Sequence, residues 1–156
     1  MLVAVCALVA LLVPATAGAA TPQWLGAQTH PFWSNNNTTD FDHELDMLAG
    51  AGANSVRVDL SWSTIELNGK GVHDPGYVAK VDRFMTDAAS RNIKVIATLW
   101  TTPCWASSAP DTAKQACAGS WWDRGVQYYA PANPNDYADI AAWVAQRWGS
   151  KMAALE

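Results

Sequence analysis

Residues 55–60, Ser-Val-Arg-Val-Asp-Leu, decide the fold class of this chain. In an extended strand, alternate side chains point to opposite faces, so the two valines and Leu60 share one face and Arg57 and Asp59 share the other. A parallel strand buried on both faces is normally apolar throughout, and two buried opposite charges are costly unless they are paired or functional. The stretch therefore predicts a strand with one face against helices and one charged face. On that charged face, Arg57 and Asp59 form either a structural pair between layers or part of a site.

The segments on either side alternate between strand and helix patterns. Further strands are expected at 24–30, at 93–100 and from 152 onward. Helices are expected after Asp40, Asp74-Pro75 and Asn133-Pro134, because each polar residue can cap a helix and is followed by apolar residues at helical spacing. The resulting order, β-α-β-α-β-α-β, predicts a mostly parallel sheet with right-handed crossovers.

Two architectures fit this order, a closed (β/α)8 barrel and an open doubly wound sheet. No glycine-rich phosphate loop follows the first strand, which counts against a nucleotide-binding sheet. Three βα units are fewer than the eight of a barrel, and the fourth strand has only begun at Glu156. We therefore expect an α/β chain that is the N-terminal half of a (β/α)8 TIM barrel, from its first strand to the start of its fourth.

The first 20 residues differ from the rest in composition. Residues 1–13 are an unbroken apolar run, which Pro14 interrupts and small residues follow. An apolar core before an Ala-x-Ala site is typical of a cleavable signal peptide, and the run is too short to span a bilayer comfortably. We expect a signal peptide at 1–20, a mature domain at 21–156 and a secreted protein with no membrane attachment after cleavage. A buried N-terminal helix is the alternative.

Export places the mature chain in a compartment where disulfides persist. Its two cysteines, Cys104 and Cys117, lie in one loop rich in Pro, Ala, Ser and Gly. Their spacing, without a Cys-x-x-Cys motif or a nearby His, is poor for zinc. We expect a disulfide between them, with free thiols or a metal pair as the alternatives, and no metal or cofactor.

The charge and composition exclude several classes of function. The chain has 10 basic and 14 acidic residues, a net charge of −4, so it lacks the basic surface of a nucleic-acid-binding protein. Half of its residues are apolar, which excludes a disordered chain. No Ser–His–Asp arrangement or nucleophile elbow is present in the sequence.

Nine tryptophans in 156 residues need an explanation. Six of them follow predicted strands and fall in loops at the carboxyl-terminal rim of the sheet: Trp33, Trp62, Trp100, Trp105, Trp121 and Trp122. Because an indole stacks on the apolar face of a sugar ring, these six favour a carbohydrate groove over a merely apolar interface. Trp24, Trp143 and Trp148 are expected in the core. His30, at the end of the first strand, either faces the groove or is a structural histidine.

Three segments of the chain have a sequence, order and spacing that resemble those of one enzyme family. They are residues 54–62 (Asn-Ser-Val-Arg-Val-Asp-Leu-Ser-Trp), residues 94–106 with their Thr-Pro-Cys-Trp loop, and residues 136–149. These segments resemble the second strand, the third strand and the helix before the fourth strand of clan A glycoside hydrolases, the cellulase-like and xylosidase-like (β/α)8 enzymes. The resemblance covers roughly residues 24–156 and implies hydrolysis of O-glycosidic bonds.

The same resemblance implies roles for two residues. Arg57 matches an arginine that helps to hold the nucleophile, whereas Glu156 matches a strand residue a few places before the Asn-Glu pair that supplies the acid/base. The nucleophile is a Glu at the end of the seventh strand, so both catalytic carboxylates are expected to be absent here and no catalytic residue is assigned. In the full-length enzyme the two carboxyl groups would lie about 5–5.5 Å apart and act by a retaining mechanism.

We therefore expect a secreted glycosidase fragment, inactive by itself, from an enzyme that acts on a plant-type or microbial polysaccharide. The residues expected to bind substrate are His30, Trp33, Arg57, Asp59, Trp62, Trp100, Trp105, Trp121 and Trp122. The expected partner is an oligo- or polysaccharide, with no nucleic acid and no membrane, and the full-length protein is expected to be a monomer. The alternatives are a non-catalytic carbohydrate-binding domain with the same groove and a small doubly wound domain that binds a partner protein.

Overall fold

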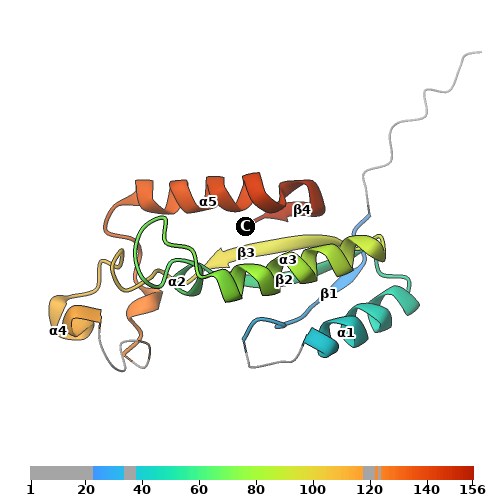
Figure 1. Cartoon of the computed structure of the whole chain (residues 1–156), viewed down its shortest axis with the longest axis horizontal. Helices are drawn as coiled ribbons and strands as arrows, with labels where there is room; N and C mark the ends of the chain where they lie inside the picture. The colour runs from blue at the N-terminus through green and yellow to red at the C-terminus, as the bar shows by residue number, and fades with distance from the viewer. Residues whose placement is uncertain (1–22, 34–37, 118–121, 123) are drawn as a thin grey trace, which may run out of the picture.

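The computed structural model describes residues 23–33, 38–117, 122 and 124–156, and its elements follow the predicted alternation (Figure 1). The strands are β1 (Gly26–Gln28), β2 (Ser55–Ser61), β3 (Lys94–Trp100) and β4 (Met152–Leu155). The helices are α1 (Thr38–Gly50), α2 (Trp62–Ile65), α3 (Pro75–Ser90), α4 (Asp111–Lys114) and α5 (Pro134–Trp148). Three short 3-10 helices are η1 (Gln115–Cys117), η2 (Val126–Tyr128) and η3 (Gly149–Lys151). The expected signal peptide at 1–20 lies outside the described residues.

The four strands form one parallel sheet in the order β1-β2-β3-β4. In its register, Arg57 of β2 lies opposite Gln28 of β1 and Ile96 of β3. Because all strands run the same way, their carboxyl ends meet at one edge of the sheet. In Figure 1 the arrowhead of β3 points toward the segment that holds α4, so the long connection after β3 lies at this edge.

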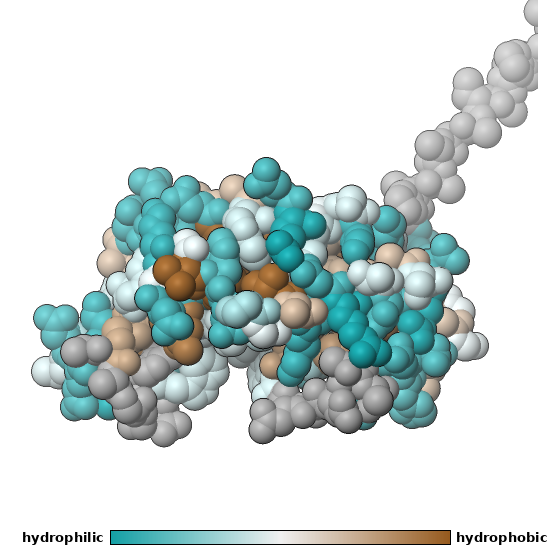
Figure 2. Space-filling model, in the orientation of Figure 1, coloured by the Kyte–Doolittle hydropathy of each residue, from teal (hydrophilic) through white to brown (hydrophobic). Residues whose placement is uncertain are grey.

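The core lies between the sheet and the helices. The apolar face of β2 and the corresponding face of β3 are fully or almost fully buried, and they pack in one cluster with side chains from α1, α3 and α5. The members of this cluster that show the layering best are Val56, Val58, Leu60, Val95, Ala97, Leu99, Phe41, Leu45, Phe84, Met85, Ile140 and Val144. Burial of each such side chain contributes about 1.5–3 kcal/mol. The outer surface over α3 and α5 is mostly hydrophilic, with small apolar areas between the two helices (Figure 2).

The opposite face of the sheet carries the charged residues of β2. Arg57 is half-buried there, and Ile96, Thr98 and Trp100 of β3 share this face because their neighbours in sequence point to the helices. The sequence left open which of the two faces of β3 would be covered by helices. Pairing settles the question, since Asp59 lies opposite Thr98.

Two of the three long helices begin as predicted. The Asp74 carboxylate accepts a hydrogen bond from the Tyr77 amide (2.7 Å), and Pro75 follows at the first helical position. The Asn133 side chain accepts a hydrogen bond from the Asn135 amide (3.1 Å), again with a proline next in sequence. These caps position α3 and α5 relative to the ends of β2 and β3.

The start of α1 differs from the expectation. Helix α1 begins at Thr38, so Asp40 lies in its first turn and is not its cap. Helix α5 ends at Trp148 with Gly149 as its C-cap, and Gly149 keeps a right-handed helical backbone (φ −54°) as the chain continues into η3. Helix α2 is short enough to leave no periodic pattern in the sequence, and it was not predicted.

None of the helices in the described part of the chain has the length and apolar content that crossing a membrane requires.

Candidate functional site

A cavity of about 270 Å³ opens at the carboxyl ends of the strands, where barrel sites are found. Residues from five parts of the chain line it: Phe32, Trp33, Asp59, Ser61, Thr64, Tyr77, Trp100, Trp122 and Tyr128. We refer to this cavity as the groove. Six of these nine side chains are aromatic, and one of them, Phe32, makes edge contacts with Phe41 and Phe84 of the core.

The aromatic wall of the groove is built around Trp33 and Trp100. Their rings stack with centroids 5.1 Å apart and planes 13° from parallel. Tyr128 lies on the other side of the wall, 6.4 Å from Trp100 between ring centroids. Trp33, Trp122 and Tyr128 are exposed by 58%, 43% and 69%, so they present ring surface to a ligand. Exposed aromatic rings around a concave site are the surfaces on which sugar rings stack.

The polar part of the groove centres on Asp59, which is 8% exposed. His30 Nδ1 lies 3.2 Å from Asp59 Oδ2, and Arg57 Nη1 lies 3.8 Å from Oδ1. Nδ1 of His30 therefore faces the Asp59 carboxylate, and Nε2 lies on the opposite edge of the ring. The His30 ring also contacts Trp33, with centroids 4.7 Å apart. The charged face of β2 and the aromatic wall therefore belong to one site.

Arg57 joins this site to β4. Its Nε donates to Glu156 Oε2 (2.9 Å), and its Nη1 donates to Gln28 (3.0 Å). Thr98 Oγ1 donates to the same oxygen of Glu156 (3.0 Å). The hydrogen bond from Arg57 is the main reason that the pKa of Glu156 lies below its usual value, and Thr98 adds to this effect. The carboxylate of Glu156 is therefore held ionised beside a cation.

Tyr77 is a groove residue that the sequence did not single out, because its position in the apolar stripe of α3 predicted only a core contact. Its hydroxyl accepts the Ser61 amide hydrogen (3.0 Å), and burial raises the pKa of Tyr77 to about 12. The phenol therefore stays protonated at neutral pH and keeps its own hydrogen to donate.

Four hydroxyl groups form a network at the ends of β2 and β3. Ser61 Oγ lies 3.0 Å from Ser63 Oγ, 2.8 Å from Thr64 Oγ1 and 3.0 Å from Thr101 Oγ1. Thr101 has a left-handed backbone (φ 62°), which is unusual for a β-branched residue and turns the chain sharply after β3. No sequence pattern marks these residues, since serine and threonine are common in loops.

Two of the predicted rim tryptophans do not present a ring to the groove. Trp62 is 1% exposed and packs in the core, and its Nε1 donates to Glu66 Oε2 (2.7 Å). Trp105 Nε1 donates to the Glu66 carbonyl (2.7 Å), and its ring meets Trp62 edge to face. Trp62 thus has a structural place in the core, because α2 turns the chain inward directly after β2. Trp105 is partly buried against that core and does not line the groove.

The remaining tryptophans divide differently from the expectation. Trp24 was expected in the core but is 48% exposed, since β1 is a short edge strand. Trp148 is buried as predicted, and Trp143 is partly buried against the same core. Trp121, a predicted substrate-binding residue, lies outside the described residues.

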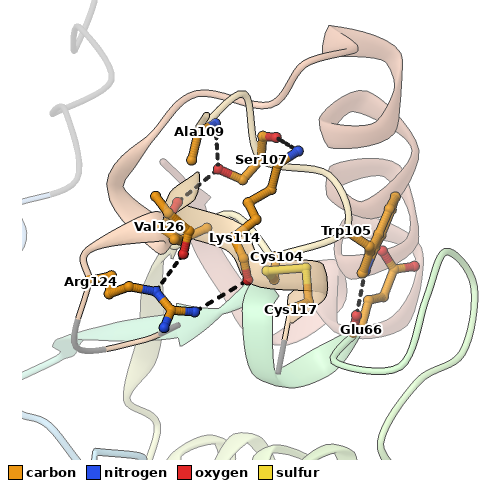
Figure 3. The surroundings of a disulfide bond; sticks show 10 residues. Glu66, Cys104, Trp105, Ser107, Ala109, Lys114, Cys117, Arg124 and Val126 are labelled. Atoms are coloured by element: carbon orange, nitrogen blue, oxygen red, sulfur yellow. Dashed lines mark hydrogen bonds between the residues drawn. A yellow bond between two sulfur atoms is a disulfide. The ribbon is translucent and has the colours of Figure 1, made fainter. Parts of the chain in front are cut away.

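The predicted disulfide is present in the structure. It joins Cys104 and Cys117, whose Cα atoms are 5.4 Å apart, in the long connection after β3 (Figure 3). Cys104 forms a small second core with Ala109 and Val126. This connection carries Trp122 and Tyr128 to the groove.

The chemistry that the groove offers is binding of a polar ligand with apolar faces. Of the described residues that line it, Asp59 is the one carboxylate, whereas glycoside hydrolysis requires two carboxyl groups across the bond that breaks. No cluster of three or more His, Cys, Asp or Glu suited to a metal ion occurs within the described parts of the chain.

Comparison with solved structures shows the fold. The β-glycosidase BGL167 aligns with a TM-score of 0.58 at 14% identity, over 86% of this chain and 36% of that one. A family 39 glycoside hydrolase from Bacteroides cellulosilyticus gives 0.55 at 17% identity, over 83% of this chain and 23% of that one. A rice β-glucosidase gives 0.52 at 19% identity, over 76% and 22%. The four parallel strands are thus consistent with part of a (β/α)8 barrel, and the chain spans only 22% to 36% of the length of these structures.

No curated protein matches the chain. The family model described as cellulase (glycosyl hydrolase family 5) matches residues 15–155, nearly the whole sequence. The chain therefore belongs to glycosyl hydrolase family 5, the cellulase family.

Proposed function

We propose that residues 21–156 form the N-terminal half of the barrel of a secreted, retaining glycoside hydrolase, and that the groove binds sugar units of a plant-type or microbial polysaccharide. The observation that carries this proposal is the stacked pair of Trp33 and Trp100 beside the Asp59 carboxylate. An aromatic face next to a fixed acceptor matches a sugar ring, which has an apolar face and a rim of hydroxyl groups.

In this proposal each side of the groove has its own task. The exposed face of Trp33 stacks on a sugar ring, while the oxygens of Asp59 accept hydrogen bonds from its hydroxyls. His30 keeps Asp59 in place, with the two groups 3.2 Å apart. Arg57 holds carboxylates, as its contact with Glu156 illustrates, and in the full-length enzyme it would help to hold the nucleophile.

Hydrolysis itself is assigned to carboxyl groups outside residues 21–156. A retaining glycosidase needs one carboxyl group to protonate the leaving oxygen and a second to attack the anomeric carbon. Asp59 and Glu156 both contact the same guanidinium. The hydrogen bond from Arg57 holds the pKa of Glu156 below its usual value, so this carboxyl group is ionised and is not the protonated acid.

Export is part of the same proposal. The apolar segment at 1–20 has the composition of a signal peptide. The disulfide between Cys104 and Cys117 supports this reading, because structural disulfides are rare in reducing compartments.

A non-catalytic carbohydrate-binding domain is the second candidate. The single carboxylate among the described groove residues favours it, since binding needs no acid–base pair. Both candidates predict sugar binding, and they differ in whether a longer chain that contains the remaining strands hydrolyses its ligand.

Binding is tested by titrating the mature chain with cellohexaose and xylohexaose in a calorimeter. We expect Trp33→Ala to weaken binding of the preferred sugar by about tenfold, which corresponds to about 1.4 kcal/mol. Trp24→Ala is the matched control, because Trp24 is similarly exposed (48%) but does not line the groove. Equal losses for the two variants, or no binding by the unmodified chain, would contradict the proposal.

Activity is tested on β-glucan and xylan. The chain 21–156 alone is expected to release no reducing sugar above a control without protein, because the described residues of its groove include one carboxyl group and hydrolysis needs two. A longer chain carrying the remaining barrel strands is expected to hydrolyse one of these polymers. Turnover by 21–156 alone would overturn the division of roles proposed here.

A further inference from the structure

We infer that Arg124 is a positioning residue: together with the Cys104–Cys117 disulfide it sets the place of Trp122 and Tyr128, and through them the affinity of the groove. The inference rests on the proposed sugar-binding function. It concerns the described residues 102–117, 122 and 124–132, which we call the stapled lobe.

The stapled lobe has its own core and its own hydrogen bonds. Cys104, Ala109 and Val126 are at most 4% exposed and form a cluster separate from the main core. Ser107 is fully buried, and its Oγ donates to the Val126 carbonyl (2.8 Å) and accepts from the Ala109 amide (3.1 Å). Trp105 and Ala106 join the lobe to the main core, whereas Cys104, Ala109 and Val126 pack among themselves.

The two limbs of the lobe are tied together at its base. The Thr102 amide donates to the Gln127 carbonyl (2.9 Å), and the Ala132 amide donates to the Ala106 carbonyl (2.7 Å). The limb that returns toward α5 is thus anchored close to the end of β3. The bond to the Gln127 carbonyl holds the chain next to Tyr128, whereas Trp122 lies further from this base along the limb, on the other side of Gly125.

Two tight turns connect Trp122 to Tyr128. The Gly125 amide donates to the Trp122 carbonyl (3.0 Å), and the Tyr128 amide donates to the Gly125 carbonyl (3.0 Å). Gly125 has a left-handed backbone (φ 71°), which a residue without Cβ adopts at no steric cost. These turns join Trp122, Gly125 and Tyr128 into one hydrogen-bonded unit, and Arg124 lies within this unit in the sequence.

Arg124 connects this unit to the disulfide. Its guanidinium donates to the carbonyl groups of Ala113 and of Lys114 (3.2 Å for the latter) and to Gln115 Oε1 (3.0 Å). These acceptors lie at the carboxyl end of α4, where unpaired carbonyl groups and the helix dipole favour a cation. Figure 3 shows Arg124 reaching toward this helix end, beside the sulfur–sulfur bond.

The disulfide fixes the helix end to which Arg124 binds. Cys117 follows the carboxyl end of α4 by three residues, and both Gln115 (φ 43°) and Cys117 (φ 62°) have left-handed backbones that non-glycine residues seldom adopt. Such a conformation persists when its surroundings hold it. The bond to Cys104, close to the end of β3, supplies that constraint. A continuous set of contacts therefore leads from β3 through the disulfide, α4 and Arg124 to the exposed rings of the groove.

The inference is tested with Arg124→Gln in the mature chain, using cellohexaose and xylohexaose as probes. We expect binding of the preferred probe to weaken by about fivefold or more, because the neutral amide cannot bridge the same acceptors. Arg124→Lys, which retains the charge, is expected to recover part of the loss. Arg83→Gln is the matched control, since Arg83 lies on α3 and pairs with Asp42 of α1 and Asp87 of α3.

A second measurement separates positioning from general destabilisation. Hydrogen exchange in Arg124→Gln is expected to accelerate at the amides of 111–117 and 125–128 and to stay unchanged in β2 and β3. The Cys104→Ala/Cys117→Ala double variant is expected to show the same pattern. In a double-mutant cycle, Tyr128→Ala is expected to cost less affinity in the Arg124→Gln background than in the unmodified chain.

The outcomes distinguish the two proposals. If the unmodified chain binds neither probe, the proposed function fails, and the exchange pattern alone then decides whether Arg124 orders the lobe. Unchanged exchange at 125–128 in Arg124→Gln overturns the inference, as does affinity equal to that of Arg83→Gln. Faster exchange spread evenly over β2 and β3 also overturns it, because Arg124 would then stabilise the whole domain.

Discussion

Glu66 shows how one buried carboxylate organises residues that are distant in the sequence. The residue is 4% exposed, its Oε2 accepts from Trp62 Nε1 (2.7 Å), and its Oε1 accepts from the Gly71 amide (2.8 Å). Its backbone carbonyl accepts from Trp105 Nε1 (2.7 Å). These contacts explain why Trp62 and Trp105 point inward although both follow strand ends. Their positions along the chain had predicted that they would line the groove.

Replacing Glu66 with Gln tests this role. The two carboxylate oxygens face two donors, so in the amide one donor must face an NH2 group and lose its partner. We expect Glu66→Gln to lower the free energy of unfolding by about 1–3 kcal/mol, measured by urea denaturation. Asp139→Asn is the control, because Asp139 is an exposed partner of Lys70 and should change stability by less than about 0.5 kcal/mol. A loss no larger than that of the control would contradict the role given to Glu66.

At the scale of elements, charged pairs join the helices that cover the sheet. Asp82 of α3 accepts from Arg147 Nε (3.0 Å) and from Trp148 Nε1 (2.8 Å), both at the end of α5. Asp42 of α1 similarly pairs with Arg91 beyond the end of α3 (3.1 Å). Acidic residues near a helix start are already accounted for by the helix dipole, so in the sequence they do not point to distant partners. Their partners lie more than 40 residues away, so no local pattern could reveal them.

The Asp82 contacts predict a pH dependence. The hydrogen bond from Arg147 is the main cause that lowers the pKa of Asp82, and Trp148 adds to it. A carboxyl group whose pKa is lower in the folded state stabilises the fold above its unfolded pKa, near 4, and this contribution disappears as the pH falls through the folded pKa. Because the Asp82 side chain is 41% exposed and the pair is screened by solvent, we expect Asp82→Asn to cost only about 0.5–1 kcal/mol at pH 7.

The measurement compares denaturation of the unmodified chain and of Asp82→Asn at pH 7 and at pH 2.5. The difference between the two proteins should shrink at the lower pH, because the unmodified carboxylate is then protonated as well. Asp87→Asn, which removes a pair within α3, serves as a second comparison. A difference that is constant with pH would show that the Asp82 charge has no part in joining α3 to α5.

The elements were predictable where the local signal was strong. The alternation of apolar and charged side chains in residues 55–60 predicted β2, and the pairs of a capping residue and a proline predicted the starts of α3 and α5. Both features depend only on neighbours in the sequence. The groove was predictable only in part. His30, Trp33, Asp59 and Trp100 follow from their places at strand ends, whereas Tyr77 and Ser61 meet through packing between α3 and β2. Helix α2 reversed the direction of Trp62, and a four-residue helix has too few residues to show a period.

The whole molecule presents a sheet that is covered by helices on one face. Among the described residues, β1 pairs only with β2 and β4 only with β3, so both outer edges carry unpaired backbone groups. The uncovered face is less apolar than β3 alone suggested, because Arg57, Thr98 and Glu156 bind one another there. In residues 21–156 alone, the open edges at β1 and β4 therefore favour self-association more than the uncovered face does.

We expect the chain 21–156 to be marginally stable and to self-associate through these edges. The edge at β1 is the more exposed, because β1 has three residues and Leu25, which precedes it, is 60% exposed. The Leu25 carbonyl still accepts from the Asn54 amide (2.8 Å), so this residue continues the pairing with β2 and its side chain stands at the open edge. Size-exclusion chromatography with light scattering should show species larger than a monomer, and unfolding should begin below about 60 °C.

A charge at this edge should reduce the association, since lysine on an edge strand opposes pairing with another chain. Leu25→Lys is therefore expected to shift the population toward monomer without lowering the unfolding temperature, because Leu25 buries little surface. Met47→Lys is the matched control: Met47 is 56% exposed on α1, away from the sheet edge, and the change adds the same charge. Equal shifts for the two variants would mean that net charge and not the β1 edge governs association. A monodisperse monomer of the unmodified chain with a sharp transition above about 60 °C would refute the edge argument itself, because the open sheet would then be stable without a partner.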